Sequence, residues 1–335
     1  MRVSGPRSRQ RQVLEGDIEP ALRFDIAAAL ASGRPVVALE STLITHGFPR
    51  PQNLEVALAA ERAVIAEGAL PATIAVRDGR LIVGLTGEEL AALAAASAGK
   101  ASRHNLAAAL VAGGWWGTTV SATMIVAHVA GIRVFATGGI GGVHRDAARS
   151  RDVSADLTEL SRTPVAVVCS GPKAVLDVSA TLEYLETHGV PVIGLGTSEL
   201  PGFWSRESGV SVPVTARDEH EAAAIVARHW VLGLGSGVVI AVPVPEADAL
   251  PLAQSEAAVV QALAEMERAG EPGSSGTGPA ATPRLLSRVA ALTDGRSVRA
   301  NAALVVHNAA VAARLAEALA ERLVGPVAQA SRRGP

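Results

Sequence analysis

The chain of 335 residues contains a single cysteine, Cys169. One thiol excludes a disulfide framework and a zinc site built from thiolate ligands, and a chain without disulfides is suited to a reducing cytoplasm. A chain of this length can bury a large core without covalent cross-links. We therefore expect a cytoplasmic, globular protein.

Aromatic residues make up only 3% of the sequence, and the formal net charge is −2. Proteins that bind single-stranded nucleic acid need aromatic stacking platforms and basic surfaces, so we expect no nucleic-acid partner. No uninterrupted apolar stretch reaches about 18 residues, which predicts no membrane span. Residues 1–12 are basic and polar with no apolar region after them, so we also expect no secretory signal.

Lysine is the scarcest charged residue, because the 30 Lys and Arg residues include only Lys100 and Lys173. Arginine cannot lose its proton in a protein, whereas a desolvated lysine can act as a nucleophile or a base. Two lysines can equally be leftovers of codon bias. Their positions must decide between these alternatives.

Short valine-rich runs alternate with alanine-rich segments of helical length, which is typical of an α/β protein. We predict an α/β/α sandwich with a mainly parallel central sheet, folded as a single domain over residues 21–325. Residues 1–20 are expected to form a flexible arm, residues 270–283 a flexible loop and residues 326–335 a C-terminal tail. Strands are predicted at 35–39, 72–76, 81–84, 133–136, 165–169, 192–194 and 238–243. Helices are predicted at 20–32, 53–67, 88–96, 103–112, 123–129, 156–161, 174–188, 219–230, 256–268 and 297–323.

Ligands of open α/β sheets bind outside the carboxyl ends of the strands, so residues that follow the predicted strands are candidates. Glu40 follows strand 35–39 in largely apolar company. Desolvation disfavours the charged form of a carboxylate, which suits Glu40 to donate a proton near neutrality. A solvated loop glutamate or a helix cap is the alternative.

Lys173 follows strand 165–169 and the turn Ser170–Gly171–Pro172. Proline favours the first turn of a helix, so we expect Lys173 in the first turn of helix 174–188. A structural cation is unfavourable at that positive helix end, which instead favours the neutral amine. We predict that Lys173 is an amine nucleophile that forms an imine with the carbonyl carbon of a sugar or a similar substrate.

Lys100 precedes a predicted helix start at Ser102, Arg103 and His104, where an anion such as phosphate would neutralise the cations. The glycine-rich run 138–142 does not have dinucleotide-binding spacing, because His144 stands where the third glycine belongs. We predict a loop that lets a substrate approach the backbone, with Thr137 and His144 at its edges. A loop histidine without a function is the alternative for His144.

Asp152, Ser154 and Asp156 alternate, so in an extended segment their side chains share one face. Hard oxygen ligands suit Mg²⁺ or Mn²⁺ with waters completing the octahedron. The competing interpretation is a capping box in which Asp156 begins a helix and Glu159 closes it.

Seven segments strongly resemble the pseudouridine-5'-phosphate glycosidases, and the resemblance runs from about residue 20 to residue 322. They are long, ordered and specific, unlike a lone glycine pattern. The segments are VVALESTLITHGFPRPQN (36–53), PATIAV (71–76), KASRHNL (100–106), GTTVSATMI (117–125), FATGGIGGVHR (135–145), DVSADL (152–157) and CSGPKAVLD (169–177).

The resemblance implies reversible cleavage of the C–C glycosidic bond of pseudouridine 5'-phosphate to uracil and ribose 5-phosphate. It also implies an α/β/α fold, a cytoplasmic homotrimer, and Mn²⁺, with Mg²⁺ as the alternative cation. The implied imine-forming lysine is Lys173 and the implied proton donor is Glu40. The implied substrate contacts are Lys100, the backbone at Val120, Ser154, Ala155, Asp156 and Asn301, and the implied metal ligand is Asp152.

The sequence also departs from the family pattern. The usual Ser-Arg-Arg-Asp-Leu reads Ser102–Arg103–His104–Asn105–Leu106, which affects the expected phosphate contacts. The pair Trp115–Trp116 and the segment 270–283 are also unusual. Another Schiff-base lyase acting on a phosphorylated sugar is the alternative enzyme, and a phosphate- or small-molecule-binding protein is the non-enzymatic alternative.

Overall fold

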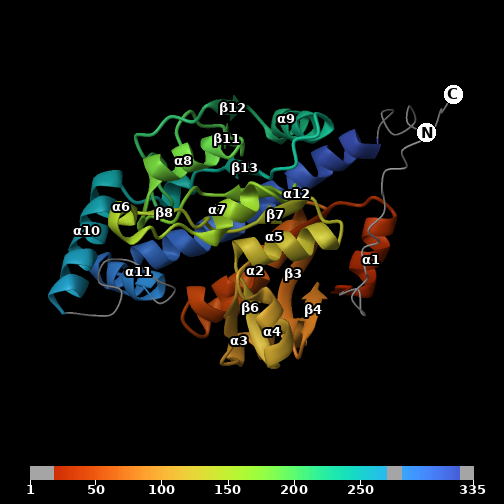
Figure 1. The fold of residues 1–335 in the computed structure, drawn as a ribbon, viewed down its shortest axis with the longest axis horizontal. Helices are drawn as coiled ribbons and strands as arrows, with labels where there is room; N and C mark the ends of the chain where they lie inside the picture. The colour runs from red at the N-terminus through yellow and green to blue at the C-terminus, as the bar shows by residue number, and fades with distance from the viewer. Residues whose placement is uncertain (1–18, 270–280, 325–335) are drawn as a thin grey trace, which may run out of the picture.

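A large mixed sheet runs through the middle of the molecule (Figure 1). The structure is a computed structural model, and it describes residues 19–269 and 281–324. Along the sheet, the parallel strands follow the order β3 (Leu70–Arg77), β2 (Val36–Leu39), β7 (Val134–Ala136), β9 (Ala166–Cys169), β13 (Val238–Ala241), β11 (Val192–Leu195) and β12 (Val214–Ala216). Beyond β3 lie the antiparallel neighbours β4 (Arg80–Val83) and β6 (Trp115–Thr118), with β1 (Ala21–Leu22) on β4 and β5 (Gly99–Ala101) on β6.

The parallel strands β2, β9 and β13 are short and apolar along their whole length because both of their faces are buried. Neighbouring side chains of β2 enter different cores, with Val37 in the core of one face and Ala38 in the core of the other. This alternation follows from the period of two in a strand. The predicted mainly parallel α/β fold is confirmed.

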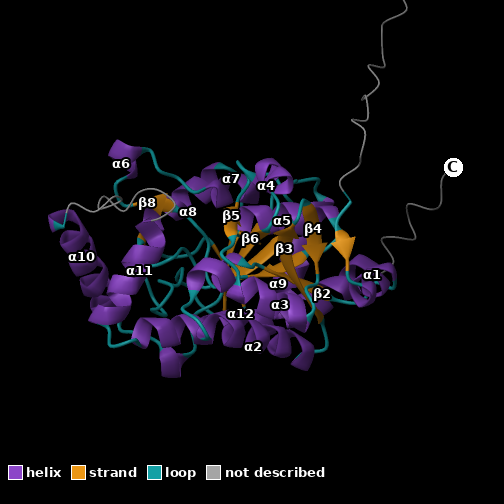
Figure 2. Cartoon of the chain, turned by 90° about the horizontal axis from the view of Figure 1, so that it is seen from below, coloured by secondary structure: helices purple, strands orange, loops and turns teal. Residues whose placement is uncertain are grey.

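Helices cover both faces of the sheet (Figure 2). One face is packed by α2 (Gln52–Ala66), α9 (Glu219–Val231), α10 (Leu252–Arg268), α11 (Ala281–Leu292) and α12 (Arg296–Val324). The other is packed by α1 (Phe24–Ala31), α4 (Leu106–Ala112), α5 (Val120–Val129), α7 (Ala155–Leu160) and α8 (Val178–Thr187). The remaining elements are α3 (Gly87–Ala95), α6 (Ala147–Ser150), the π-helix η1 (Leu43–Gly47), the 3₁₀ helix η2 (Glu246–Asp248) and a small antiparallel pair, β8 (Val143–His144) with β10 (Leu176–Asp177).

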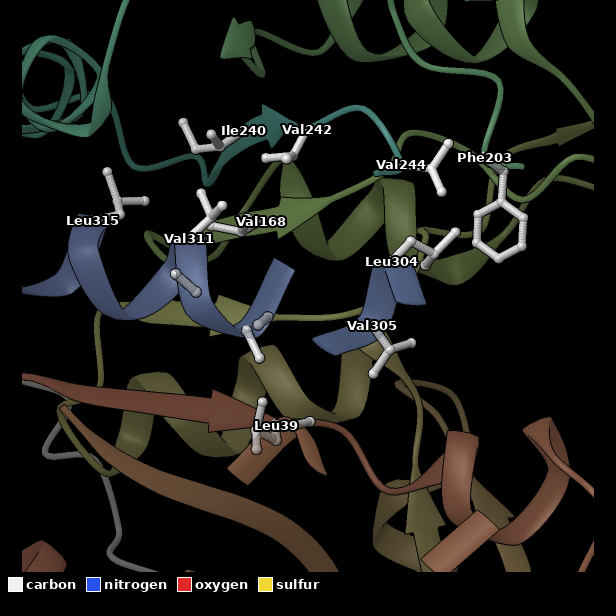
Figure 3. Packing of buried hydrophobic residues seen from close by; sticks show 14 of the residues in the cluster. Leu39, Val168, Phe203, Ile240, Val242, Val244, Leu304, Val305, Val311 and Leu315 are labelled. Carbon is white, nitrogen blue, oxygen red and sulfur yellow. The ribbon is translucent and has the colours of Figure 1, made fainter. Parts of the chain in front are cut away.

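The long helix α12 is the centre of one core (Figure 3). Its residues Leu304 and Leu315 are fully buried in the same cluster as Leu39, Val168 and Ile240 of the sheet. Residues Arg296–Leu323 are long and apolar enough to cross a membrane, but 61% of the apolar window is buried inside the protein. Because α12 packs against α2, α9 and the sheet, it serves as a core helix.

Several predicted helix starts were wrong. The helix predicted from residue 174 begins at Val178, because Leu176–Asp177 pair with β8 as an extended strand. The helix predicted from residue 20 begins at Phe24, and the helix expected next to Lys100 begins only at Leu106, with Lys100 inside strand β5. Most of the predicted arm, loop and tail lies outside the described residues. The exceptions are Glu19 and Pro20 of the arm and residues 281–283 of the loop, which belong to α11.

Replacing Leu315 with alanine should lower the free energy of unfolding by about 2–5 kcal/mol, because a buried cavity adds to the lost transfer energy. Leu323→Ala in the same helix is the matched control, since Leu323 is 43% exposed and should cost about 1 kcal/mol or less. Chemical denaturation measures both values. Equal losses for the two variants would contradict the central packing of α12.

Candidate active site

Three neighbouring strands end at the same edge of the sheet, and each is followed by a polar residue. Glu40 follows β2, Thr137 follows β7 and Ser170 follows β9. The register pairs Leu39 with Ala136 across β2 and β7, so the residues after these strands lie next to each other. The edge has the position that the sequence predicted for ligand binding.

Glu40 is buried at this edge, with 5% of its surface exposed. One carboxylate oxygen accepts a hydrogen bond from the Thr42 hydroxyl, and the other accepts one from the Thr137 hydroxyl. Both alternatives to a functional role, a solvated loop glutamate and a helix cap, are therefore wrong. The structure gives Thr137 a contact with Glu40, whereas the sequence had predicted a contact with substrate.

The loop that carries Lys173 is joined to the glycine-rich loop by backbone hydrogen bonds. Ser170 N donates to Gly138 O at 2.9 Å, Ile140 N to Gly171 O at 3.1 Å, and Lys173 N to Ile140 O at 3.1 Å. A Cβ atom at Gly139 would lie 2.7 Å from the Phe203 ring, so this glycine permits close packing. Lys173 precedes α8 by several residues, so the prediction that it lies in the first turn of a helix was wrong.

Two neighbouring chambers, which share three lining residues, lie above this edge. A narrow chamber of about 70 Å³ is lined by Glu40, His46, Phe203 and Asn301, together with Gly138 and Gly139. A wide chamber of about 380 Å³ is lined by Ser102, His104, Asn105, Thr119, His144, Asp152, Ser154, Ala155 and Asp156. Thr42, Lys100 and Lys173 line both chambers. Both lysines of the chain therefore lie where the chambers meet.

The two amines repel each other electrostatically. Burial, and secondly the charge of Lys173, hold the pKa of Lys100 below its ordinary value, while Asp156 and Glu40 act in the opposite direction. An anion bound between the chambers would offset this repulsion. Burial raises the pKa of Cys169 to about 12, so its thiol is not a competing nucleophile near neutrality.

Asp156 links three segments around the wide chamber. Its carboxylate accepts hydrogen bonds from Ser121 N and Gly141 N, each at 2.9 Å. Ser154 is the N-cap of α7 and accepts from Asp156 N at 3.2 Å, so the capping box that began at Asp156 was wrong. Asp156 thus fixes the glycine-rich loop to the start of α5.

Asp152 and His144, which the sequence assigned to different roles, lie together in the wide chamber. His144 Nε2 is 3.7 Å from Asp152 Oδ2. Within residues 19–269 and 281–324, no group of three or more His, Cys, Asp and Glu side chains is arranged around a metal position. The donor set fits a hard cation held by one carboxylate, with water and substrate oxygens as its other ligands.

Fewer cations are free to bind a phosphate near Lys100 than the sequence predicted. Arg103 forms an ion pair with Glu159, which is buried, so its charge is already compensated. Lys100 and the exposed His104 remain beside the wide chamber. Val120 is buried as the first residue of α5, whose positive N-terminal end follows the chamber residue Thr119.

Thr42, His46 and Asn308 were not predicted from the sequence. Thr42 follows Glu40 by two residues inside a segment already singled out, so proximity to Glu40 could have identified it. His46 lines the narrow chamber from η1, and burial and Lys100 hold its pKa below its ordinary value. Asn308 reaches the edge from α12, far away in the sequence, and only its polarity in an apolar helix was a signal.

The fold and this edge define an α/β enzyme with a buried carboxylic acid and an amine on one cavity. Residues 25–318 match the family described as Indigoidine synthase A like protein. A pseudouridine-5'-phosphate glycosidase from Sorangium cellulosum (strain So ce56) is 52% identical over 303 residues, which cover 90% of this chain and 94% of that protein. The corresponding protein from Paracoccus denitrificans (strain Pd 1222) is 53% identical, covering 90% of this chain and 98% of its own length.

Solved structures agree with this assignment. The prealnumycin C-glycosynthase AlnA in complex with ribulose 5-phosphate has a TM-score of 0.84 and 39% identity, covering 95% of this chain and all of that chain. An indigoidine synthase A-like protein from Thermotoga maritima has a TM-score of 0.80 and 33% identity, covering 90% and 97%. The chain belongs to the pseudouridine-5'-phosphate glycosidase family, and the resemblance seen in the sequence is confirmed.

Anion binding should depend on the charge of Lys100. Ribitol 5-phosphate carries a phosphate but no carbonyl, so it can bind without forming an imine. Because the pKa of Lys100 lies below its ordinary value of 10.5, affinity should fall as the pH rises, and the fall should begin below pH 10.5. Lys100→Met should weaken binding at neutral pH by about 10- to 100-fold.

Isothermal titration calorimetry across this pH range measures the effect. The Lys100→Met variant is also the control, since only the part of the pH dependence that it removes belongs to Lys100. A wild-type affinity that is constant up to about pH 10 would contradict the role of Lys100.

Proposed function

We propose that the chain cleaves the C–C bond between uracil and C1' of pseudouridine 5'-phosphate, giving uracil and ribose 5-phosphate in a reversible reaction. The observation that carries the proposal is that Glu40, Lys100 and Lys173 all line the narrow chamber. Support also comes from the curated relatives, which are named for this activity, and from the C-glycosynthase, whose structure holds a pentulose phosphate.

The chambers suggest how the substrate lies. The wide chamber has Lys100, Ser102, Asn105 and the start of α5 around it, so we assign the phosphate to this side. The narrow chamber has Glu40, the Phe203 ring and the Asn301 amide, so we assign the uracil ring to it. C1' then lies at the junction, beside Lys173.

The chemistry requires an amine because uracil carbon is a poor leaving group in simple hydrolysis. The amine of Lys173 bonds to C1' as the C1'–O4' bond breaks; the bonding electrons go to O4', which takes up the proton that the amine loses. When the bond from C1' to C5 of uracil breaks, the nitrogen lone pair forms a C=N bond to C1', and the bonding electrons go to the uracil ring. Glu40 supplies the proton that C5 gains, and water then hydrolyses the imine to release ribose 5-phosphate.

The Thr42 and Thr137 hydroxyls give Glu40 a fixed orientation for this proton transfer. A hydroxyl that donates to each carboxylate oxygen holds the acid in place without adding a charge. Lys100 contributes positive charge at the junction and does not form the imine in this proposal. The alternative, another Schiff-base lyase acting on a phosphorylated sugar, uses the same lysine but does not release uracil.

We further propose one divalent cation, Mn²⁺ or Mg²⁺, bound through Asp152. When bound there, the cation supplies positive charge for the oxygens of the phosphorylated sugar. Asp152, with His144 next to it, would hold it from the wide chamber. A homotrimer in the cytoplasm completes the proposal, in keeping with the resemblance and with the single cysteine, Cys169.

The direct test is to incubate the protein with pseudouridine 5'-phosphate and Mn²⁺ and to follow uracil and ribose 5-phosphate by chromatography. Equal amounts of both products are expected. Imine trapping with ribose 5-phosphate but no release of uracil would favour the alternative lyase, and neither result would favour a binding protein.

Lys173→Arg should lower turnover at least about 10³-fold while the fold is kept, because a guanidinium has similar charge and bulk but cannot attack carbon. Borohydride added with ribose 5-phosphate should add a reduced sugar phosphate to the wild-type protein, located on Lys173 by peptide mapping. Lys100→Arg is the matched control and should still form the adduct. An adduct on Lys100 would contradict the assignment.

Glu40→Gln should slow uracil release by about 10²- to 10⁴-fold, because the amide keeps the size of the side chain but cannot transfer the proton. Imine formation from ribose 5-phosphate does not involve uracil, so borohydride should still trap the adduct on Lys173. Mass spectrometry detects the adduct, and the rate of uracil release is measured on the same variant. Lost release without an adduct would mean that Glu40 binds or opens the ribose.

Asp152→Asn should shift the Mn²⁺ dependence of turnover to higher metal concentration, since the amide brings no negative charge to a hard cation. Direct Mn²⁺ binding, measured by electron paramagnetic resonance without substrate, should weaken in parallel. Asp177→Asn, at a carboxylate that caps α8, is the control and should leave Mn²⁺ binding unchanged. An unchanged titration for Asp152→Asn would remove the metal from this residue.

A further inference from the structure

Asn308 is a fully buried asparagine of α12, with an exposed fraction of 0%. Its side chain reaches the two loops that follow β7 and β9. Asn308 Nδ2 donates to Thr137 O at 2.9 Å and lies 3.4 Å from Gly138 O, and its amide contacts Ser170 Oγ at 3.1 and 3.3 Å. Two helical turns after Asn301, which lines the narrow chamber, α12 thus places a second amide at the edge of the sheet.

The chemistry of the partners fixes the orientation of the amide. Thr137 O and Gly138 O can only accept hydrogen bonds, so the nitrogen of Asn308 must face them. The Ser170 hydroxyl can donate to Asn308 Oδ1 in this orientation. Since a buried amide is costly unless its polar atoms are paired, these contacts also account for the tolerance of an asparagine in the core.

Each loop that Asn308 touches carries one part of the proposed chemistry. The Thr137 hydroxyl donates to Glu40, while Ser170 begins the turn that leads to Lys173. The two loops are also joined by backbone hydrogen bonds, from Thr137 N to Val168 O and from Ser170 N to Gly138 O. Asn308 adds a side-chain link between them from the helix beneath.

We propose that Asn308 is a positioning residue, which holds the acid Glu40 and the nucleophile Lys173 at a fixed separation by linking their two loops. It contacts neither substrate nor the reacting atoms. The inference rests on the proposed function for the roles of Glu40 and Lys173. Loss of the link should therefore affect the chemical step more than substrate binding, because Asn308 lines neither chamber.

Asn308→Ala should lower kcat by about 10- to 100-fold, as expected for small displacements of reacting groups, and should leave KM within about twofold. Ser236→Ala is the matched control. Ser236 is also buried, and its hydroxyl bonds to Gly189 O and His229 before the start of β13, at the other end of the sheet. It should lower the melting temperature without changing kcat.

If Asn308→Ala does not fold, Asn308→Ser keeps a short donor in the same place and should fold with a smaller loss of kcat. A normal kcat in a folded variant, or a rise in KM that accounts for the whole loss, would overturn the inference. Inactive wild-type protein, with no uracil and no trapped adduct, would overturn the proposed function and this inference with it.

A double-mutant cycle tests the route through Thr137. Thr137→Val removes the hydroxyl that donates to Glu40 while keeping the shape of the side chain. If Asn308 acts through Thr137, Asn308→Ala should lower kcat less in the Thr137→Val variant than in the wild type. The decrease in log kcat should be at most about half as large. If the fold-loss of kcat in the double variant equals the product of the two single losses, the two residues act independently. That result would overturn this part of the inference.

Discussion

The site depends on the hydrogen-bond ladder that continues past the ends of β7 and β9. The two strands run parallel, and after Ala136 and Cys169 their loops stay paired up to Lys173 N, which donates to Ile140 O. Because parallel strands end at one edge, this pairing brings Lys173 of one loop to the same chamber as Glu40, which accepts a hydrogen bond from Thr137 of the other loop. Glycines make the approach possible, since a side chain at Gly139 or Gly171 would collide with neighbouring atoms.

Charge is divided between two residue types in a way that matches their chemistry. Arginines supply structural ion pairs, such as Arg103 with Glu159 and Arg314 with Glu67 and Glu219. The two lysines lie instead at the junction of the chambers. A planar, permanently charged guanidinium suits a carboxylate partner, whereas only an amine can become neutral and attack carbon. The scarcity of lysine in the sequence therefore pointed to two residues that lie together at the candidate site.

Particular elements show how far the sequence could be used. The strand ends before Glu40, Thr137 and Lys173 were predictable, because short apolar runs bounded by glycine and polar residues mark buried parallel strands. The start of α8 was not, since Leu176–Asp177 become extended only by pairing with β8. The same holds for Lys100, which pairs in β5 beside β6 and reaches the junction through the antiparallel part of the sheet. Such pairings are made between segments far apart in sequence, and local propensity does not encode them.

The sequence by itself determined the α/β class, the family and the residue types that can carry the chemistry, because periodicity, long ordered motifs and reactive groups are local properties. Only the tertiary structure decided which of these residues meet. In the folded chain, the Thr137 hydroxyl donates to Glu40, and two backbone N–H groups donate to Asp156. Arg103 pairs with Glu159 instead of contributing to the expected phosphate cluster. Asn308 contacts the strand-end loops from α12. The physical reason is that a buried polar group must find a partner wherever the packing of distant segments provides one.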